Sequence, residues 1–492
     1  MGPLRPDPDF ADPSRRTFLR RAGGLACASL AGCAARQDAN IPPPATVPPS
    51  QQALLEDLER RTFNFFWETA NPSNGLVPDR WPSASPCSIA SVGFALTCYA
   101  IGVDRGYLLR AAARDRVLTT LRFFANAPQG PQANGVSGYN GFFYHFLDMQ
   151  TGLRANQSEL STVDSALLVA GVLFCQSWFN DPVDAGEAEI RQLADTIYGA
   201  MNWPWFQVNV PLVNMAWTPE SGFAQADWEG YVEAMILYIQ ALGSPTHPVG
   251  PAAWTAWCAT YPLYWGTYMG QTYLSFAPTL GHQYSHLWID FRNIQDSYTA
   301  GKGIDYFENS RRAALAQQAY AIANPMQWQG YDGLIWGITA SDGPARTTQT
   351  YLGSSRSFRG YSARGAGIVS AFDDGTLAPT ASLASLPFAP EIVLPTLEAL
   401  AQRYGTLIYS QYGFVDAFNP SFNYPVPLSY GRLVPGFGWV DTDYIGIDQG
   451  AILGMIGNYR DGMVWNTMKT NPYIVRGLRQ AGFTGGWLAA TP

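Results

Sequence analysis

Acidic residues recur at the starts of apolar segments that have helical periodicity. The carboxylates concerned are those of Asp164, Glu233, Glu308 and Asp448. A carboxylate in the first turn of a helix can simply cap free N–H groups and stabilise the helix dipole, and this alternative stays open for each residue taken alone. Aromatic residues lie at the same ends: Trp217, Trp228, Tyr231, Tyr306 and Tyr444. Aromatic faces with few charges suit a neutral ligand rich in hydroxyl groups.

Glu233 is the strongest candidate for acid–base chemistry. It precedes an apolar run that ends at Leu242, so we expect it about one turn inside a helix, past the capping position. Burial there should raise its pKa, which suits a general acid. Cleavage of a glycosidic bond needs such an acid and a second carboxyl group. The two lie about 6.5–9.5 Å apart in inverting enzymes and about 5–5.5 Å apart in retaining ones.

Other chemistries fit the sequence less well. His282 and His286 have the i, i+4 spacing of some zinc sites, but no Glu follows His282. Asp373 and Asp374 could bind a metal, but Gly375 follows them and favours a turn. The chain has two lysines and no phosphate-binding loop, and it has no Gly-x-Ser-x-Gly motif. We therefore expect no metal and no cofactor.

The composition supports a carbohydrate-like ligand over a polyanion. Of the 492 residues, 47% are hydrophobic and 14% are charged, and the formal net charge is −8. A nucleic-acid-binding protein needs a basic face to neutralise phosphates, so that class of protein is excluded. The chain contains 16 Trp, 26 Tyr and 26 Phe, most of which we expect in the core.

The N-terminus has the pattern of an export signal. Arg15 and Arg16 precede a weakly apolar stretch over residues 22–31, as in twin-arginine signals. The stretch ends in Leu-Ala-Gly-Cys33, which resembles a bacterial lipoprotein box and implies a lipid on Cys33. A Pro-rich linker over 34–50 follows. We expect an exported periplasmic lipoprotein, anchored to the outer membrane by its lipid alone, with no transmembrane helix.

The body from residue 51 to 492 reads as one mainly helical domain. Helical periodicity predicts helices over 52–69, 87–103, 105–126, 160–180, 184–202, 228–242, 252–261, 283–297, 303–323, 362–373, 388–404, 446–459 and 470–481. Some, such as 105–126, are amphipathic, whereas others, such as 163–174, are apolar on every side and must be buried. This alternation predicts an (α/α)6 toroid of inner and outer helices with short β-hairpins in its loops. Stacked helical repeats are the alternative, but no fixed period is present. We expect Cys87, Cys98, Cys175 and Cys258 to be buried free thiols.

Several motifs resemble one known family. They are Ser88-Ile-Ala-Ser-Val-Gly-Phe, Gly141-Phe-Phe-Tyr-His-Phe-Leu-Asp148, Glu159-Leu-Ser-Thr-Val-Asp164, Gly230-Tyr-Val-Glu233-Ala-Met, Gly243-Ser-Pro-Thr-His247-Pro, His282-Gln-Tyr-Ser-His286-Leu-Trp-Ile-Asp290, Asp305-Tyr-Phe-Glu308-Asn-Ser-Arg-Arg, Gly413-Phe-Val-Asp416-Ala-Phe-Asn419 and Tyr444-Ile-Gly-Ile-Asp448-Gln-Gly. In this order they resemble the glycoamylase-like family, which includes bacterial endo-β-1,2-glucanases and the cyclising domain of cyclic β-1,2-glucan synthases. The resemblance implies an (α/α)6 fold, in agreement with the two kinds of helix.

The resemblance also implies residue roles. Glu233 matches the general acid of the family. Asp416 is the first candidate for the second carboxylate, and Glu308 and Asp448 are the next candidates. Asp164 matches an acid that lines the donor side of the cleft. The Thr-Val-Asp164 stretch is closer to the synthases, which retain configuration, than to the glucanases, which invert. The mechanism therefore stays open.

These observations predict a monomeric glycoside hydrolase that acts on a β-glucan, with β-1,2-glucan and endo action as the first choice. A β-1,2-glucan transglycosylase or an exo-acting β-1,2-glucosidase is the alternative within this class, and a non-catalytic glucan-binding lipoprotein is the alternative outside it. A polysaccharide lyase would prefer a basic cleft, which the acidic composition disfavours. Besides the acids, the predicted substrate contacts are Trp228, Tyr231, Tyr306, His286, Tyr444 and Arg364 or Arg359.

Overall fold

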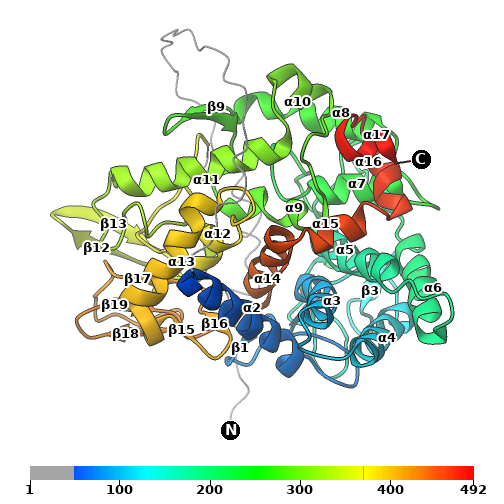
Figure 1. Ribbon diagram of the computed structural model, residues 1–492, viewed down its shortest axis with the longest axis horizontal. Coiled ribbons are helices and arrows are strands. Elements are labelled where there is room, and N and C mark those ends of the chain that lie inside the picture. Colours follow the sequence, from blue (N-terminus) through cyan, green and yellow to red (C-terminus); the bar gives the residue numbers. More distant parts are fainter. Residues whose placement is uncertain (1–48, 370, 492) are drawn as a thin grey trace.

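The computed structural model describes residues 49–369 and 371–491. This part of the chain is mainly helical, with many short strands (Figure 1). None of its helices is both long enough and apolar enough to cross a membrane. The predicted export signal with Arg15 and Arg16, the lipid attachment at Cys33 and nearly all of the linker over 34–50 lie outside the described residues.

Six helices of the described chain are buried along most of their length. They are α3 (Ile89–Asp104), α5 (Thr162–Trp178), α7 (Met235–Gly243), α9 (Tyr284–Trp288), α12 (Pro379–Leu383) and α14 (Gly446–Arg460). The sequences of α3, α5 and α7 are apolar on nearly every side, so these three helices are stable only when neighbours cover them all round.

Six longer or more exposed helices alternate with these along the chain. They are α2 (Pro49–Thr69), α4 (Arg110–Asn126), α6 (Ala185–Gly199), α8 (Ala252–Ala259), α11 (Tyr306–Ala323) and α13 (Pro390–Tyr404). Near the end of the chain, α13 packs against α2, and α14 packs against both α2 and α3 (Figure 1). The last helix pair thus lies against the first. The remaining helices are α10 (Ser297–Lys302), α15 (Met463–Met468), α16 (Pro472–Gln480) and α17 (Gly486–Ala490).

Glycines allow the closest contact between two buried helices. A Cβ atom on Gly93 of α3 would lie 2.1 Å from the carbonyl oxygen of Leu167 in α5. A Cβ atom on Gly171 of α5 would lie 2.1 Å from the carbonyl oxygen of Gly93. Because any side chain would clash with backbone at these positions, the two helices pack this closely only with glycine at both.

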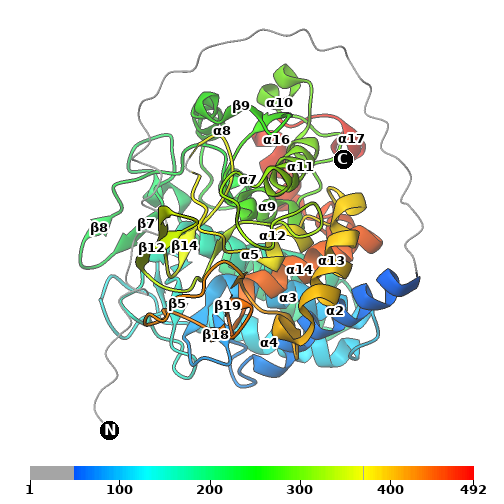
Figure 2. The same cartoon turned by 90° about the vertical axis from the view of Figure 1, so that its left-hand side faces the viewer.

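Short antiparallel strands cover one end of the helices. Seven two-stranded sheets pair β1 (Arg80–Trp81) with β20 (Tyr444–Ile445), β2 (Cys87–Ser88) with β5 (Phe146–Leu147), β3 (Gly138–Tyr139) with β4 (Phe142–Phe143), β9 (Trp265–Tyr268) with β10 (Gln271–Leu274), β11 (Ala340–Ser341) with β14 (Ser362–Ala363), β12 (Thr347–Tyr351) with β13 (Ser354–Phe358), and β15 (Tyr409–Ser410) with β16 (Gly413–Phe414) among the described residues. Two three-stranded sheets have the order β6 (Leu160–Ser161), β7 (Ala216–Thr218), β8 (Gly222–Phe223) and the order β17 (Phe418–Asn419), β19 (Gly438–Val440), β18 (Arg432–Val434). Figure 2 shows many of these strands gathered on one side of the helices. The helices α3, α5 and α14 each begin directly after a strand, namely β2, β6 and β20, so their N-termini face this side.

The structure corrects four predicted helices, of which the one over 228–242 is shortened to α7, which begins at Met235. Residues 362–369 and 371–373 do not form a helix, because β14 pairs with β11 there and the chain then turns through Asp374. The predicted helix over 283–297 is limited to the five residues of α9, and the helix predicted from residue 105 begins at Arg110. The four cysteines in the described chain are unpaired thiols. Three of them are buried as expected, but Cys258 is half-buried.

Candidate active site

Three aspartates meet where separate strands end. Asp342 follows β11, Asp416 lies between β16 and β17, and Asp441 follows β19. The pairing of β17 with β19 continues through a hydrogen bond of 2.9 Å from the Asp441 N–H to the carbonyl of Ala417, which brings Asp416 and Asp441 together. One carboxylate oxygen from each aspartate lies within 4.8 Å of the others, and all three residues are buried.

Asp448 joins this cluster from the first turn of α14. It shares a hydrogen bond with Asp416. Burial, followed by the charge of Asp342, raises the pKa of Asp416 to about 6, while the hydrogen bond from Asp448 acts to lower it. Burial and the neighbouring Asp416 raise the pKa of Asp448 well above its usual value. Asp448 is therefore the protonated donor of the pair near neutral pH, and Asp416 is the group that ionises first.

Arg80 is the cation within this acidic region. Its Nη1 lies 2.5 Å from Asp342 and 3.7 Å from Asp443, and its Nε lies 3.5 Å from Asp79. The antiparallel pairing of β1 with β20 sets Arg80 opposite Ile445, beside the segment that contains Asp443. Burial and the charge of Asp342 also raise the pKa of Asp441 well above its usual value. The cluster is thus neutralised partly by Arg80 and partly by bound protons.

Glu233 lies in the turn before α7, not one turn inside the helix as predicted, because α7 begins at Met235. Its carbonyl accepts a hydrogen bond of 2.8 Å from the hydroxyl of Ser285, which in turn accepts the Ile236 N–H at 3.0 Å. Tyr284 connects Glu233 with the aspartate cluster. Burial raises the pKa of Tyr284 well above its usual value, and the charges of Asp448, Tyr361, Glu233 and Asp416 raise it further. The charges of Glu233 and of the cluster therefore act on the same phenol group.

Asp164 lies in a second group of titratable residues, at the first turn of α5. Its carboxylate is 3.7 Å from Nε2 of His145, whose Nδ1 lies 3.0 Å from Glu159. The indole N–H of Trp228 donates to the hydroxyl of Thr162 at 2.9 Å, which ties this helix start to the segment before Glu233. The predicted role of Trp228 was a contact with substrate. Its side chain is buried, so it supports the site and does not present its face to a ligand.

Three of the predicted substrate contacts lie in the protein core. Tyr231 and Tyr306 are fully buried, and their rings stack 6.0 Å apart. The hydroxyl of Tyr306 donates to Asp296 at 3.0 Å, and Nε2 of His286 lies 3.0 Å from the hydroxyl of Ser310. Burial lowers the pKa of His286 to about 3, so its ring is neutral. Packing inside the protein replaces the ligand contact expected for these three side chains.

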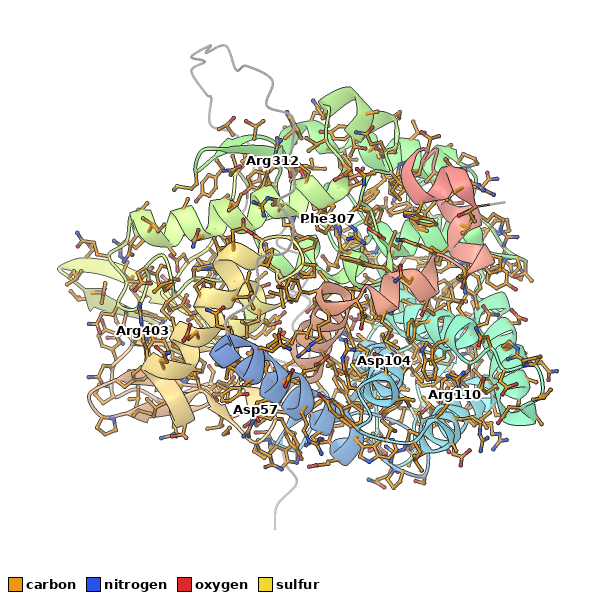
Figure 3. The ribbon with its side chains drawn as sticks, in the orientation of Figure 1. Asp57, Asp104, Arg110, Phe307, Arg312 and Arg403 are labelled. Atoms are coloured by element: carbon orange, nitrogen blue, oxygen red, sulfur yellow. The ribbon has the colours of Figure 1, made fainter. Side chains whose placement is uncertain are left out.

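Glu308 does not join the aspartate cluster in the structure. It forms a 2.6 Å ion pair with Arg312 one turn further along α11, and its N–H is capped by Asp305. Figure 3 shows Arg312 on the outer side of the molecule along α11. The carboxylate of Glu308 therefore stabilises a helix instead of serving as the second catalytic acid.

Tyr444 lies in an aromatic group beside the cluster. Its ring is 5.5 Å from that of Tyr412 and 6.3 Å from that of Trp81, its partner across the β1–β20 pair. Its hydroxyl lies 2.5 Å from the hydroxyl of Ser410. The aromatic residues Trp81 and Tyr412 were not predicted; Trp81 becomes a neighbour of Tyr444 only through the pairing of β1 with β20, and Tyr412 comes from the loop between β15 and β16.

Arg364 is placed differently from the prediction. Its side chain is fully buried and forms a bidentate ion pair with Asp374, in which Nε and Nη2 lie 2.7 and 2.9 Å from the two carboxylate oxygens. It also donates to the carbonyls of Ser341, Asp342 and Arg359 at 2.7, 3.1 and 2.8 Å. A guanidinium group used in this way holds loops together, so the predicted contact with substrate hydroxyls is wrong for Arg364.

The sequence reasoning missed Asp342, Asp441, Asp443 and Arg80. The prediction rested on acids at helix starts, whereas Asp342, Asp441 and Asp443 lie in loops at strand ends and Arg80 lies in strand β1. The available signal was the Asp441-Thr-Asp443 pair immediately before the Tyr444 motif. Asp342 offered no comparable signal, since it stands alone between Ser341 and Gly343.

Among the described residues, two groups have the spacing that a cation would require. They are Asp342, Asp416 and Asp441, and His145, Glu159 and Asp164. In the first group, the 2.5 Å contact between Arg80 and Asp342 supplies a positive charge, and the raised pKa values keep further protons in place. This arrangement suits proton transfer.

The fold and the site define a mainly helical protein whose strand-covered end gathers buried carboxyl groups and aromatic rings. Comparison with known families takes the assignment further. The model of the Glycoamylase family, described as "Putative glucoamylase", matches residues 225–472. The chain belongs to this family, which confirms the resemblance found in the sequence.

Individual proteins match over most of the chain. An exo β-1,2-glucooligosaccharide sophorohydrolase (non-reducing end) from Parabacteroides distasonis is 26% identical over 469 residues, which cover 88% of this chain and 58% of that protein. The chain therefore spans little more than half the length of this relative. A crystal structure from Bacteroides uniformis, described in the same words as the family, has 27% identity and a TM-score of 0.75, with 90% of this chain and 100% of that chain covered. An endo-β-1,2-glucanase from Chitinophaga pinensis, in complex with sophorotriose and glucose, has the same fold with a TM-score of 0.75 at 24% identity, over 89% of this chain and 100% of that chain.

Proposed function

We propose that this protein is a glycoside hydrolase that cleaves β-1,2-glucan. The observation that carries the proposal is the hydrogen-bonded pair of Asp416 and Asp448, whose charges act on the same tyrosine as the charge of Glu233. Glycosidic cleavage needs one carboxyl group that is protonated and another that ionises. The substrate class is supported by the similarity to the sophorohydrolase over 88% of the chain.

In this proposal, Glu233 protonates the leaving oxygen, directly or through a substrate hydroxyl. Asp416 acts as the base that activates water, since its pKa of about 6 lets it accept a proton near neutral pH. Asp448 donates a hydrogen bond to Asp416 and favours its ionised form. Trp81 is only partly buried and provides an apolar face for uncharged sugar rings, and the buried ring of Tyr444, 6.3 Å away, supports it.

We further propose that the six buried and six outer helices form an (α/α)6 toroid in a single catalytic domain over 51–492. The packing of α13 against α2, and of α14 against α3, supports closure of the ring. In such a ring the inner helices run parallel, so their N-termini collect at one end. The strands that precede α3, α5 and α14 lie at the end where the carboxylates meet.

Endo action is our first candidate, and the fold of the Chitinophaga pinensis endo-glucanase supports it. Exo action that releases a disaccharide is the second, because the Parabacteroides distasonis relative is named for that activity. A time course with long linear β-1,2-glucan separates them. Endo action produces a range of intermediate lengths early, whereas exo action produces one short product from the start.

The activity itself is tested with residues 51–492, β-1,2-, β-1,3- and β-1,4-glucans, and chromatography of the products. We expect cleavage of β-1,2-glucan alone.

Glu233→Gln should lower kcat by roughly 10³-fold while glucan binding stays within about twofold. Glu308→Gln is the matched control, since Glu308 pairs with Arg312 and should retain activity. A wild-type protein that cleaves no glucan would exclude the hydrolase in favour of a glucan-binding protein. Optical rotation of the first products distinguishes inversion from retention.

We also propose that the protein is an exported lipoprotein attached through Cys33 and held at the outer membrane. The twin arginines and the Leu-Ala-Gly-Cys33 box support this. Cys33→Ala should move the protein from the membrane fraction to the soluble fraction, and an unchanged distribution would contradict the anchor.

A further inference from the structure

One peptide group connects a buried arginine to Asp416. The N–H of Asp342 donates to Oδ2 of Asp416 at 2.7 Å. The carbonyl of the same Ser341–Asp342 peptide accepts a hydrogen bond of 2.7 Å from Nη1 of Arg364. Because a peptide group is planar and its N–H and C=O point in opposite directions, a group that holds the oxygen also sets the direction of the N–H.

The surroundings of Arg364 are built to hold it in one orientation. Its side chain is fully buried, and Asp374 binds Nε and Nη2 at 2.7 and 2.9 Å. The carbonyl of Gly360 accepts from Nη2 at 2.9 Å. A Cβ atom on Gly343 would lie 2.0 Å from Nη2, so the glycine leaves the space that the guanidinium occupies.

We infer that Arg364 is a positioning residue for the base Asp416, acting through the Ser341–Asp342 peptide. The inference rests on the proposed function and deepens it. Arg364 holds the peptide oxygen, so that the Asp342 N–H points at the Asp416 carboxylate and stabilises its ionised form. The buried positive charge also polarises the peptide, which strengthens the N–H as a donor where water is excluded.

Asp416 faces several other charged or titratable groups, and the effect of Arg364 adds to theirs. They are Asp342, Asp441, Asp448, Arg80 and Tyr284. Asp342, Asp441 and Asp448 are also acidic, and negative charge on a neighbouring carboxylate disfavours the ionised form of Asp416. A fixed N–H donor from the backbone is therefore important for Asp416, because it stabilises that ionised form. Arg364→Lys and Gly343→Ala replace none of these side chains, so each variant acts on Asp416 through the hold of Arg364 on the peptide.

Two variants test the inference. Arg364→Lys keeps the positive charge, but a lysine ammonium group cannot bind both oxygens of Asp374 and also donate to the Ser341 carbonyl in the way a planar guanidinium does. Gly343→Ala keeps the arginine and displaces its Nη2. For each we expect the acidic limb of the kcat–pH profile to move upward by about one pH unit. The ratio of variant to wild-type kcat should therefore fall about tenfold at about pH 5 and less than about twofold at about pH 8, with KM nearly constant. Arg110→Lys is the control, since Arg110 of the outer helix α4 makes a similar bidentate contact with Glu187 of α6 and donates to the carbonyl of Trp178 at the end of α5; Figure 3 labels Arg110.

The results distinguish a failure of the proposed function from a failure of the inference about Arg364. Wild-type protein that does not cleave β-1,2-glucan would overturn the proposed function. If the wild type is active and a folded Arg364→Lys or Gly343→Ala protein loses kcat equally at both pH values, Arg364 has only a structural role and the inference is wrong. If one variant does not fold, which thermal unfolding reveals, the other decides the question.

Discussion

The hydrogen bond between Asp448 and Asp416 predicts different outcomes for two substitutions of Asp448. Asp448 is 4% exposed, and its pKa is raised well above the usual value, so it is neutral near pH 6 and donates to Asp416. Asp448→Ala removes the donor. A hydrogen bond to a charged acceptor contributes about 1.5–3 kcal/mol, so the pKa of Asp416 should rise by about 1–2 pH units. Asp448→Asn keeps an N–H donor and should change that pKa by less than about 0.5.

The assay is kcat on β-1,2-glucan between about pH 4 and pH 9, where the acidic limb reports the base. Asp448→Ala should move this limb upward from about pH 6, the pKa of Asp416, and Asp448→Asn should leave it close to the wild type. An equal shift in both variants would mean that donation by Asp448 is unimportant. A shift of Asp448→Ala to lower pH would mean that Asp448 is ionised and repels Asp416, which would refute the assignment of the shared proton.

Three further predictions concern stability and positioning. Folding raises the pKa of Asp416 from 3.8 to about 6, so its ionisation destabilises the folded state as pH rises through that window. Asp416→Asn should therefore stabilise the protein by about 3 kcal/mol at about pH 8 and by much less at about pH 4, measured by urea unfolding, and an equal effect at both would contradict the raised pKa. Ser285→Ala removes the donor to the Glu233 carbonyl and should lower kcat about tenfold with little change in KM; an unchanged kcat would show that the turn holds without it. Gly93→Ala should destabilise the fold by about 1–3 kcal/mol in thermal unfolding because its Cβ would meet the Leu167 carbonyl, and a wild-type melting temperature would mean that α3 and α5 separate easily.

Much of the helical architecture was predictable because burial leaves a local pattern. The segment 163–174 is apolar on every side, and it lies within the buried helix α5. The segment 105–126 carries charges around it, and α4, which forms most of it, is partly exposed. The prediction failed over 362–373, where the buried ion pair of Arg364 with Asp374 and the pairing of β14 outweigh the local periodicity.

The site was predictable only in part. Asp448 and Asp416 were named from motifs, and they share a hydrogen bond in the structure. The prediction that aromatic side chains at the helix starts contact the substrate was less successful. Tyr231 and Tyr306 stack in the core, because an aromatic side chain at a helix start fits a packed interior as well as a binding cleft.

The sequence by itself determined most of the segments that form helices, several of those that are buried, and the resemblance to the family to which the chain belongs. Those properties follow from residue order over short stretches, and each stretch carries its own pattern. Only the tertiary structure decided that Asp342, Asp416, Asp441 and Asp448 share one buried site, that Glu233 precedes its helix, and that Arg364 holds a loop instead of a ligand. The pKa of a carboxyl group depends on burial and on neighbouring charges, and both arise only when distant strand ends and helix starts come together.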